Sequence, residues 1–143
     1  MFKKILLATD GSELSNKAIQ STLQFAKEHG SKVVGFSVAT IYPYYPVYGG
    51  EGINSEFVAA INKEAAKNVQ QISVAAASLG VDVEVHVVEG VNPHEEIIKA
   101  ADKYQCDAIF MASNGRKGLD KLFLGSEAQK VLVQSKLPVT IFK

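Results

Sequence analysis

The chain has 143 residues, of which 47% are hydrophobic, and its fifteen Lys and Arg residues balance fifteen Asp and Glu residues. This length and composition predict one globular domain over residues 1–143. Because the charges balance, we expect neither nucleic acid nor a membrane surface as a partner. With Cys106 as the only cysteine, the chain can form no intramolecular disulfide, and the cytoplasm is the expected compartment. Four apolar residues before Thr9 and the lack of any longer apolar run predict neither a signal peptide nor a transmembrane helix.

Strand and helix patterns alternate along the chain. Apolar runs predict five strands, and apolar residues at helical spacing predict four helices. The strands are predicted at 4–8, 32–38, 81–88, 108–112 and 138–142, and the helices at 13–29, 55–79, 93–104 and 126–134. A long loop over 39–54, rich in tyrosine, proline and glycine, is typical of a lid or a mobile connection. Its tyrosines could stack on a ligand or simply belong to a mobile connection between strand and helix: Tyr42, Tyr44, Tyr45 and Tyr48.

Capping residues mark several helix ends. Ser12 is the expected N-cap of the first helix, and Gly30 is its expected end. Asn92 and Glu95 have the spacing of a capping box at the start of the third helix. Over 81–88, polar residues alternate with valine, which predicts an outer strand with one half-exposed face.

The order of these elements predicts an α/β fold in three layers. Five strands alternating with four helices form an open parallel sheet with helices on both faces. Such sheets bind ligands beyond the carboxyl ends of the strands, where the strand order reverses. The polar, glycine-bearing loops follow the first and fourth strands. If these strands are neighbours, Asp10 faces the loop over 112–126 across one crevice.

The loop before the last helix predicts an anion site. Gly115 is followed by nine residues and then by Gly125 and Ser126, which begin an amphipathic helix. The first amides of a helix have no intrahelical partner and carry the positive end of its dipole, so they favour a phosphate group. Two alternatives stay open: the glycines could belong to ordinary turns, and Ser126 to Gln129 has the capping-box pattern S-x-x-Q.

Three segments of the chain resemble the universal stress protein family. They are KKILLATDGSELSNKAI at the start, GVNPHEEIIKAADKYQCDAIFMAS in the middle and NGRKGLDKLFLGSEAQKVLVQSKLPVTIFK at the end. The nucleotide-binding members carry G-x-x-G-x9-G-[ST] after the fourth strand. Gly115, Gly125 and Ser126 match this motif, whereas Ala112 stands where the first glycine is expected. The resemblance implies a Rossmann-like (HUP) sheet in the order 3-2-1-4-5, with the crevice between strands one and four.

The same resemblance implies an adenine nucleotide in that crevice, namely ATP with Mg²⁺. Asp10 would lie near the phosphates or their metal ion, although an Asp before Gly-Ser is also ordinary turn chemistry. Ala8 and Thr9 would line the site, and Val38 would offer its backbone to adenine. Ribose and phosphates would be cradled by Met111, Ala112, Ser113 and Gly115. Amides at the helix start would come from Gly125, Ser126, Glu127 and Ala128. The Ala112 methyl would strain the backbone only at positive φ.

Other charged residues give weaker signals. Arg116 and Lys117 could reach phosphate, but a charged pair in a loop is more often solvated. The histidines His29, His86 and His94 lie on different predicted elements without an acidic or cysteine neighbour at ligand spacing, so no metal cluster is expected.

The predicted function is that of a stress-response sensor or regulator. No nucleophile elbow or P-loop is present, and any ATP hydrolysis should be slow. Two alternatives stay open: a dimer with an empty crevice that acts through protein contacts, which Ala112 favours, and a slow phosphohydrolase or phosphotransferase. The apolar strand over 138–142 predicts a homodimer, because an unpaired edge is a template for another chain, and the resemblance implies the same.

Overall fold

A computed structural model of the protein describes residues 1–42, 55–115 and 123–143. All nine predicted elements are present in it. The strands are β1 (Lys4–Ala8), β2 (Lys32–Thr40), β3 (Val83–Gly90), β4 (Ala108–Ala112) and β5 (Val139–Phe142). The helices are α1 (Glu13–His29), α2 (Ser55–Leu79), α3 (Pro93–Lys103) and α4 (Ser126–Gln134).

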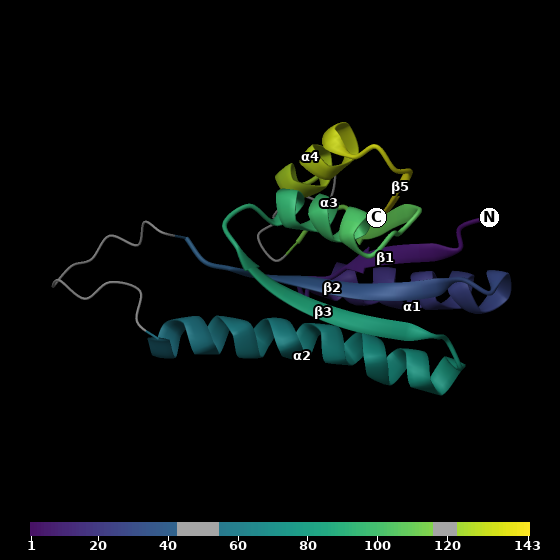
Figure 1. Ribbon diagram of the computed structural model, residues 1–143, viewed down its shortest axis with the longest axis horizontal. Helices are drawn as coiled ribbons and strands as arrows, with labels where there is room; N and C mark the ends of the chain where they lie inside the picture. Colours follow the sequence, from purple (N-terminus) through teal and green to yellow (C-terminus); the bar gives the residue numbers. More distant parts are fainter. Residues whose placement is uncertain (43–54, 116–122) are drawn as a thin grey trace, which may run out of the picture.

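The five strands form one sheet in the order β3-β2-β1-β4-β5, and every neighbouring pair is parallel. Figure 1 shows α3 and α4 on one face of this sheet and α1 and α2 on the other. The predicted three-layer α/β fold and its strand order are therefore confirmed. The outer position predicted for the third strand is also correct, because β3 lies at the end of the described sheet, next to β2.

Two apolar cores lie between these layers, and the alternation of the strands creates them. Leu6 and Ala8 of β1 face α3 and α4, whereas Ile5 and Leu7 face α1 and α2. Ile5, Leu6 and Leu7 are fully buried, so the central strand is covered on both faces. This burial pattern is the one expected of a parallel sheet.

The second and third strands differ from their predicted ranges. β2 continues to Thr40, and β3 ends at Gly90 rather than at residue 88, because the ladder between them extends to this pair. Val81 is not yet in the strand, since its amide still donates to the carbonyl of Ala76 in the last turn of α2. The predicted loop therefore begins after Thr40, and its part over 43–54 lies outside the described residues.

The predicted caps of α1 are confirmed, and Asn92 is the N-cap of α3 as predicted, whereas the capping boxes predicted for α3 and α4 do not form. The Ser12 hydroxyl accepts a hydrogen bond from the Ser15 amide at 3.2 Å, and Gly30 ends α1 at a φ of 68°. The Asn92 side chain caps nothing and instead donates to Glu95 Oε1 at 3.3 Å. Likewise, the N-cap of α4 is the residue before Ser126, so the predicted S-x-x-Q box does not form.

Candidate functional site

A cavity of about 780 Å³ lies at the carboxyl ends of β1, β2 and β4. Its lining comes from these strand ends, the start of α4, the start of α3 and one face of α2. All of the predicted site residues are in this lining: Ala8, Thr9, Asp10, Val38, Met111, Ala112, Ser113, Gly115, Gly125, Ser126, Glu127 and Ala128. The fold thus brings residues from three distant segments of the chain to one place.

The turn after β1 is held by its own side chains. The hydroxyls of Thr9 and Ser15 lie 2.7 Å apart, and Thr9 Oγ1 also accepts from the Gly11 amide at 3.2 Å. Asp10 Oδ1 accepts from the Ser12 amide at 3.0 Å. Ordinary turn chemistry is therefore present at Asp10, as the alternative interpretation expected, and the same residue lines the cavity.

The β4 loop is fitted closely against this turn and against the start of α4. A Cβ at Gly115 would overlap with Oδ2 of Asp10, so any larger residue would displace the Asp10 carboxylate. A Cβ at Gly125 would lie 2.9 Å from the carbonyl oxygen of Ser113, which is itself held by the Gly125 amide at 2.8 Å. Glycine is thus required at Gly125 by a backbone contact, whereas at Gly115 it leaves room for the Asp10 carboxylate.

The first residues of α4, Ser126, Glu127 and Ala128, line the cavity. Gly125 is the N-cap, and its carbonyl accepts the first helical hydrogen bond, from the Gln129 amide at 2.9 Å. The Gly125 amide donates to the carbonyl oxygen of Ser113, so it is not available to a ligand. Among the described residues, none accepts a hydrogen bond from the amides of 126–128. These three amides have the geometry that binds an anion at a helix start.

Ala112 causes no backbone strain. Among the described residues other than glycine, only Gln105 has a positive φ, so Ala112 is in the extended region that any residue adopts. It pairs with Phe142 at the end of β4. Because Phe110 faces the core under α1 and α2, strand alternation places the Ala112 methyl on that same face, away from α4.

A bridge between α3 and α4 was not anticipated from the sequence. The Oε2 atom of Glu127 lies 2.8 Å from both the backbone nitrogen and Nδ1 of His94, whose side chain is buried. Partial burial tends to raise the pKa of Glu127, but the hydrogen bonds from His94, together with the charges of His94 and Lys130, outweigh it and hold this pKa below its ordinary value. Glu127 therefore caps α3 from a different helix.

Comparison with known proteins identifies the family. A family model described as the universal stress protein family matches residues 1–143. The chain belongs to this family. Universal stress protein MJ0531 of Methanocaldococcus jannaschii is 33% identical over 145 residues, which cover 100% of this chain and 83% of the relative.

Solved structures share the fold of this universal stress protein. MJ0577 of Methanocaldococcus jannaschii is 29% identical, with a TM-score of 0.83 and coverage of 100% of this chain and 96% of the other. A universal stress protein from Archaeoglobus fulgidus in complex with dAMP is 20% identical, with a TM-score of 0.69 and coverage of 100% and 98%. In the part of the chain that the structure describes, no helix could cross a membrane.

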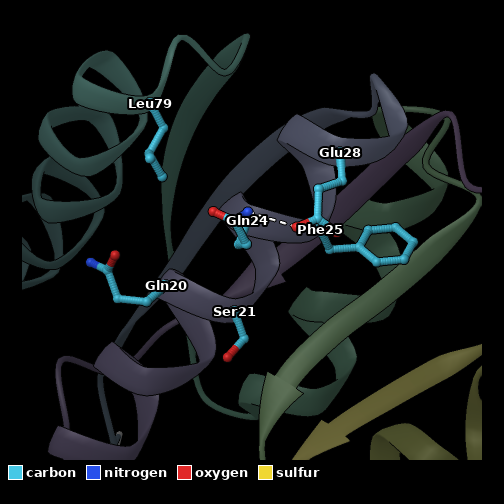
Figure 2. A pocket seen from close by; sticks show the side chains of 6 residues that line it. All are labelled: Gln20, Ser21, Gln24, Phe25, Glu28 and Leu79. Atoms are coloured by element: carbon cyan, nitrogen blue, oxygen red, sulfur yellow. Dashed lines mark hydrogen bonds between the residues drawn. The ribbon is translucent and has the colours of Figure 1, made fainter.

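A second hollow of about 540 Å³ lies beside α1, near the end of α2 (Figure 2). It is lined by Gln20, Ser21, Gln24, Phe25, Glu28 and Leu79. Gln24 Nε2 donates to Glu28 Oε1 at 2.6 Å, so these two side chains satisfy each other. None of the predicted site residues lies there, and the cavity at the strand ends remains the candidate site of this universal stress protein.

Sequence reasoning missed several residues that line the main cavity. They include Ser15, Ser37 and a row on α2 formed by Phe57, Ile61, Ala65 and Asn68. The helical spacing of that row could have indicated a shared face, but only the fold shows that this face reaches the strand ends. Tyr42 also lines the cavity, whereas Tyr44, Tyr45, Tyr48, Arg116 and Lys117 lie outside the described residues.

Proposed function

We propose that this universal stress protein is a single-domain sensor or regulator that binds an adenine nucleotide, ATP with Mg²⁺, between β1 and β4. The observation that carries the proposal is the convergence of twelve residues on a cavity of about 780 Å³. This volume is in the range of sites for ligands of nucleotide size. The dAMP bound by the Archaeoglobus fulgidus protein supports an adenine nucleotide as the ligand.

The phosphates would lie on the amides of 126–128, because these donors have no acceptor among the described residues and form the positive end of α4. Asp10 would hold Mg²⁺, since this ion is often bound by one carboxylate together with substrate phosphates and water. The described residues contain no group of three or more acidic, His or Cys side chains that could hold a metal by themselves. Bound Mg²⁺ would neutralise phosphate charge near Asp10.

Two measurements test this function. Denaturing the purified protein and analysing the supernatant by mass spectrometry should release an adenine nucleotide, and calorimetry should detect binding of Mg-ATP or AMP. If calorimetry of micromolar protein detects no heat of binding at millimolar nucleotide, the result would support the dimer with an empty crevice. Repeated turnover of ATP that is abolished in Asp10→Asn would instead favour the slow enzyme. The buried, unpaired Cys106 thiol fits the proposed location in the reducing cytoplasm.

Ala112→Gly tests whether the departure from the family motif blocks the site. We expect nucleotide affinity to change less than about threefold, because strand alternation directs the methyl away from α4 and an Ala to Gly change mainly adds backbone freedom. Calorimetry of both proteins with AMP and Mg-ATP provides the comparison. A gain of tenfold or more would show instead that the methyl obstructs the ligand.

We also propose that two copies pair through β5, whose outer edge carries no strand in the described sheet. The carbonyls of Pro138 and Phe142 accept from β4, so alternation directs the Ile141 amide outward. Ile141→Pro should therefore reduce the mass measured by light scattering to that of one 15.4 kDa chain. Ile141→Ala keeps the amide and should remain dimeric. An unchanged mass in folded Ile141→Pro would refute pairing at this edge.

A further inference from the structure

The carboxylate of Glu127 connects the candidate site to the neighbouring helix α3. Glu127 is in the first turn of α4, and it lines the main cavity with a partly exposed side chain. Its Oε2 atom is directed toward α3, where it accepts from the backbone nitrogen and from Nδ1 of His94, each at 2.8 Å. His94 is 6% exposed and does not itself line the cavity. A buried histidine outside the site therefore fixes the direction of an acidic side chain inside it.

The Glu127 side chain carries a negative charge in this position. Although partial burial raises the pKa of Glu127, the hydrogen bonds from His94 hold it below its ordinary value, so the side chain is ionised at pH 7. An anion in the first turn of a helix is attracted to the amides and to the positive dipole end of that same helix. If it were free to turn, the Glu127 carboxylate would therefore compete with a bound phosphate group.

A second side chain in this part of α4 is also held by a group outside the helix. Gln129 is the residue that the S-x-x-Q pattern would direct back over the helix start. Instead, its Nε2 atom donates to the carbonyl of Leu124 at 2.7 Å. Glu127 and Gln129 are thus both bonded to groups that do not belong to α4.

We propose that His94 is a positioning residue that keeps the Glu127 carboxylate away from the phosphate site at the start of α4. This inference rests on the proposed nucleotide function. The backbone nitrogen and imidazole of His94 hold the negative charge at α3, so the positive end of α4 remains for the phosphate of the ligand. A residue that does not contact the nucleotide thereby sets how strongly the site binds an anion.

A double-mutant cycle of His94→Phe and Glu127→Gln tests this role by calorimetry with AMP at pH 7. His94→Phe places an apolar ring beside the carboxylate, which is unfavourable for a charge, so the side chain should turn away. The released charge should weaken AMP binding about tenfold. Adding Glu127→Gln removes that charge and should restore the affinity to within about threefold of wild type. In the wild-type background, the same change should raise the affinity less than about threefold.

Three further variants make the cycle specific. His94→Asn should retain the wild-type affinity, because its side-chain nitrogen can donate to Glu127 in place of Nδ1. His94→Ala removes the same donor and serves if phenylalanine prevents folding. His86→Phe is the matched control, because His86 stacks on Tyr104 at the end of α3, with ring centroids 4.1 Å apart, and does not line the cavity. It should leave AMP affinity unchanged even where urea unfolding shows lower stability.

The outcomes separate this inference from the function on which it rests. If folded wild-type protein binds neither AMP nor ATP, the proposed function fails, and the role of His94 fails with it. If the wild type binds AMP and His94→Phe binds it equally well, only the positioning role is overturned. A loss that persists in the double variant would also overturn it, because the released carboxylate would then not be the cause.

Discussion

Replacing Gly125 with valine should weaken nucleotide binding about a hundredfold or more. A Cβ at this position would meet the backbone oxygen of Ser113 at 2.9 Å and Oδ1 of Asn114 at 3.1 Å. The backbone must therefore shift, and the amides of 126–128 shift with it. A misplacement of about 1 Å in a positioned group is enough for a loss of this size. Titration calorimetry with AMP and Mg-ATP measures it.

Two comparisons make the Gly125→Val result specific. Gly125→Ala places one methyl against the same oxygen and should cause a smaller loss. Gly80→Ala introduces backbone strain at a φ of 71° outside the cavity lining, and it should lower stability while leaving affinity unchanged. A Gly125→Val protein that folds and binds with wild-type affinity would contradict the placement of the phosphates at α4.

The second large effect is on stability. Glu127→Ala should lower the free energy of unfolding by about 2 kcal/mol at pH 7, as expected for losing a helix cap together with a hydrogen bond to a buried partner. The change removes the acceptor shared by the backbone nitrogen and Nδ1 of His94, and the Asn92 side chain does not replace it. Urea unfolding of both proteins measures the difference.

The pH dependence of this difference follows from the lowered pKa of Glu127. A carboxyl whose pKa is lower in the folded state stabilises the fold above its unfolded value, and this contribution is lost as the pH falls through the folded value. The difference between wild type and Glu127→Ala should therefore be constant from pH 7 to pH 5 and shrink below the ordinary value of 4.5. Glu95→Ala is the control, because Glu95 lies 3.9 Å from His94 and is more exposed. An equal loss in both variants would refute the special role of Glu127.

Much of the fold was predictable because local patterns carry it. Ser12 and Gly30 define α1 through chemistry between nearby residues, and both predictions are confirmed. The alternation over residues 81–88 correctly placed β3 at an edge of the sheet. Where the predicted ends were wrong, as at Thr40 and Gly90, the cause was pairing between two strands distant in sequence, which no local pattern shows.

The candidate site was likewise predictable only where local patterns carry it. The spacing of Gly115 and Gly125 and the polar ends of the first and fourth strands were visible in the sequence, because a parallel sheet brings such ends together at one edge. The capping pattern at Ser126 was misleading, since Gly125, in tight contact with Ser113, is the N-cap and the helix begins one residue earlier than that pattern requires.

The sequence by itself determined the order and kind of the elements and the segments that meet at the site, because periodicity and turn chemistry act between neighbours in the chain. Only the tertiary structure decided that Glu127 caps α3 through His94 and that Asn68 is buried facing the cavity. Both depend on how helices pack on the faces of the sheet, and Glu127 and His94 are 33 residues apart in the chain. Such contacts are set by the summed packing of the whole fold, which no short stretch of sequence records.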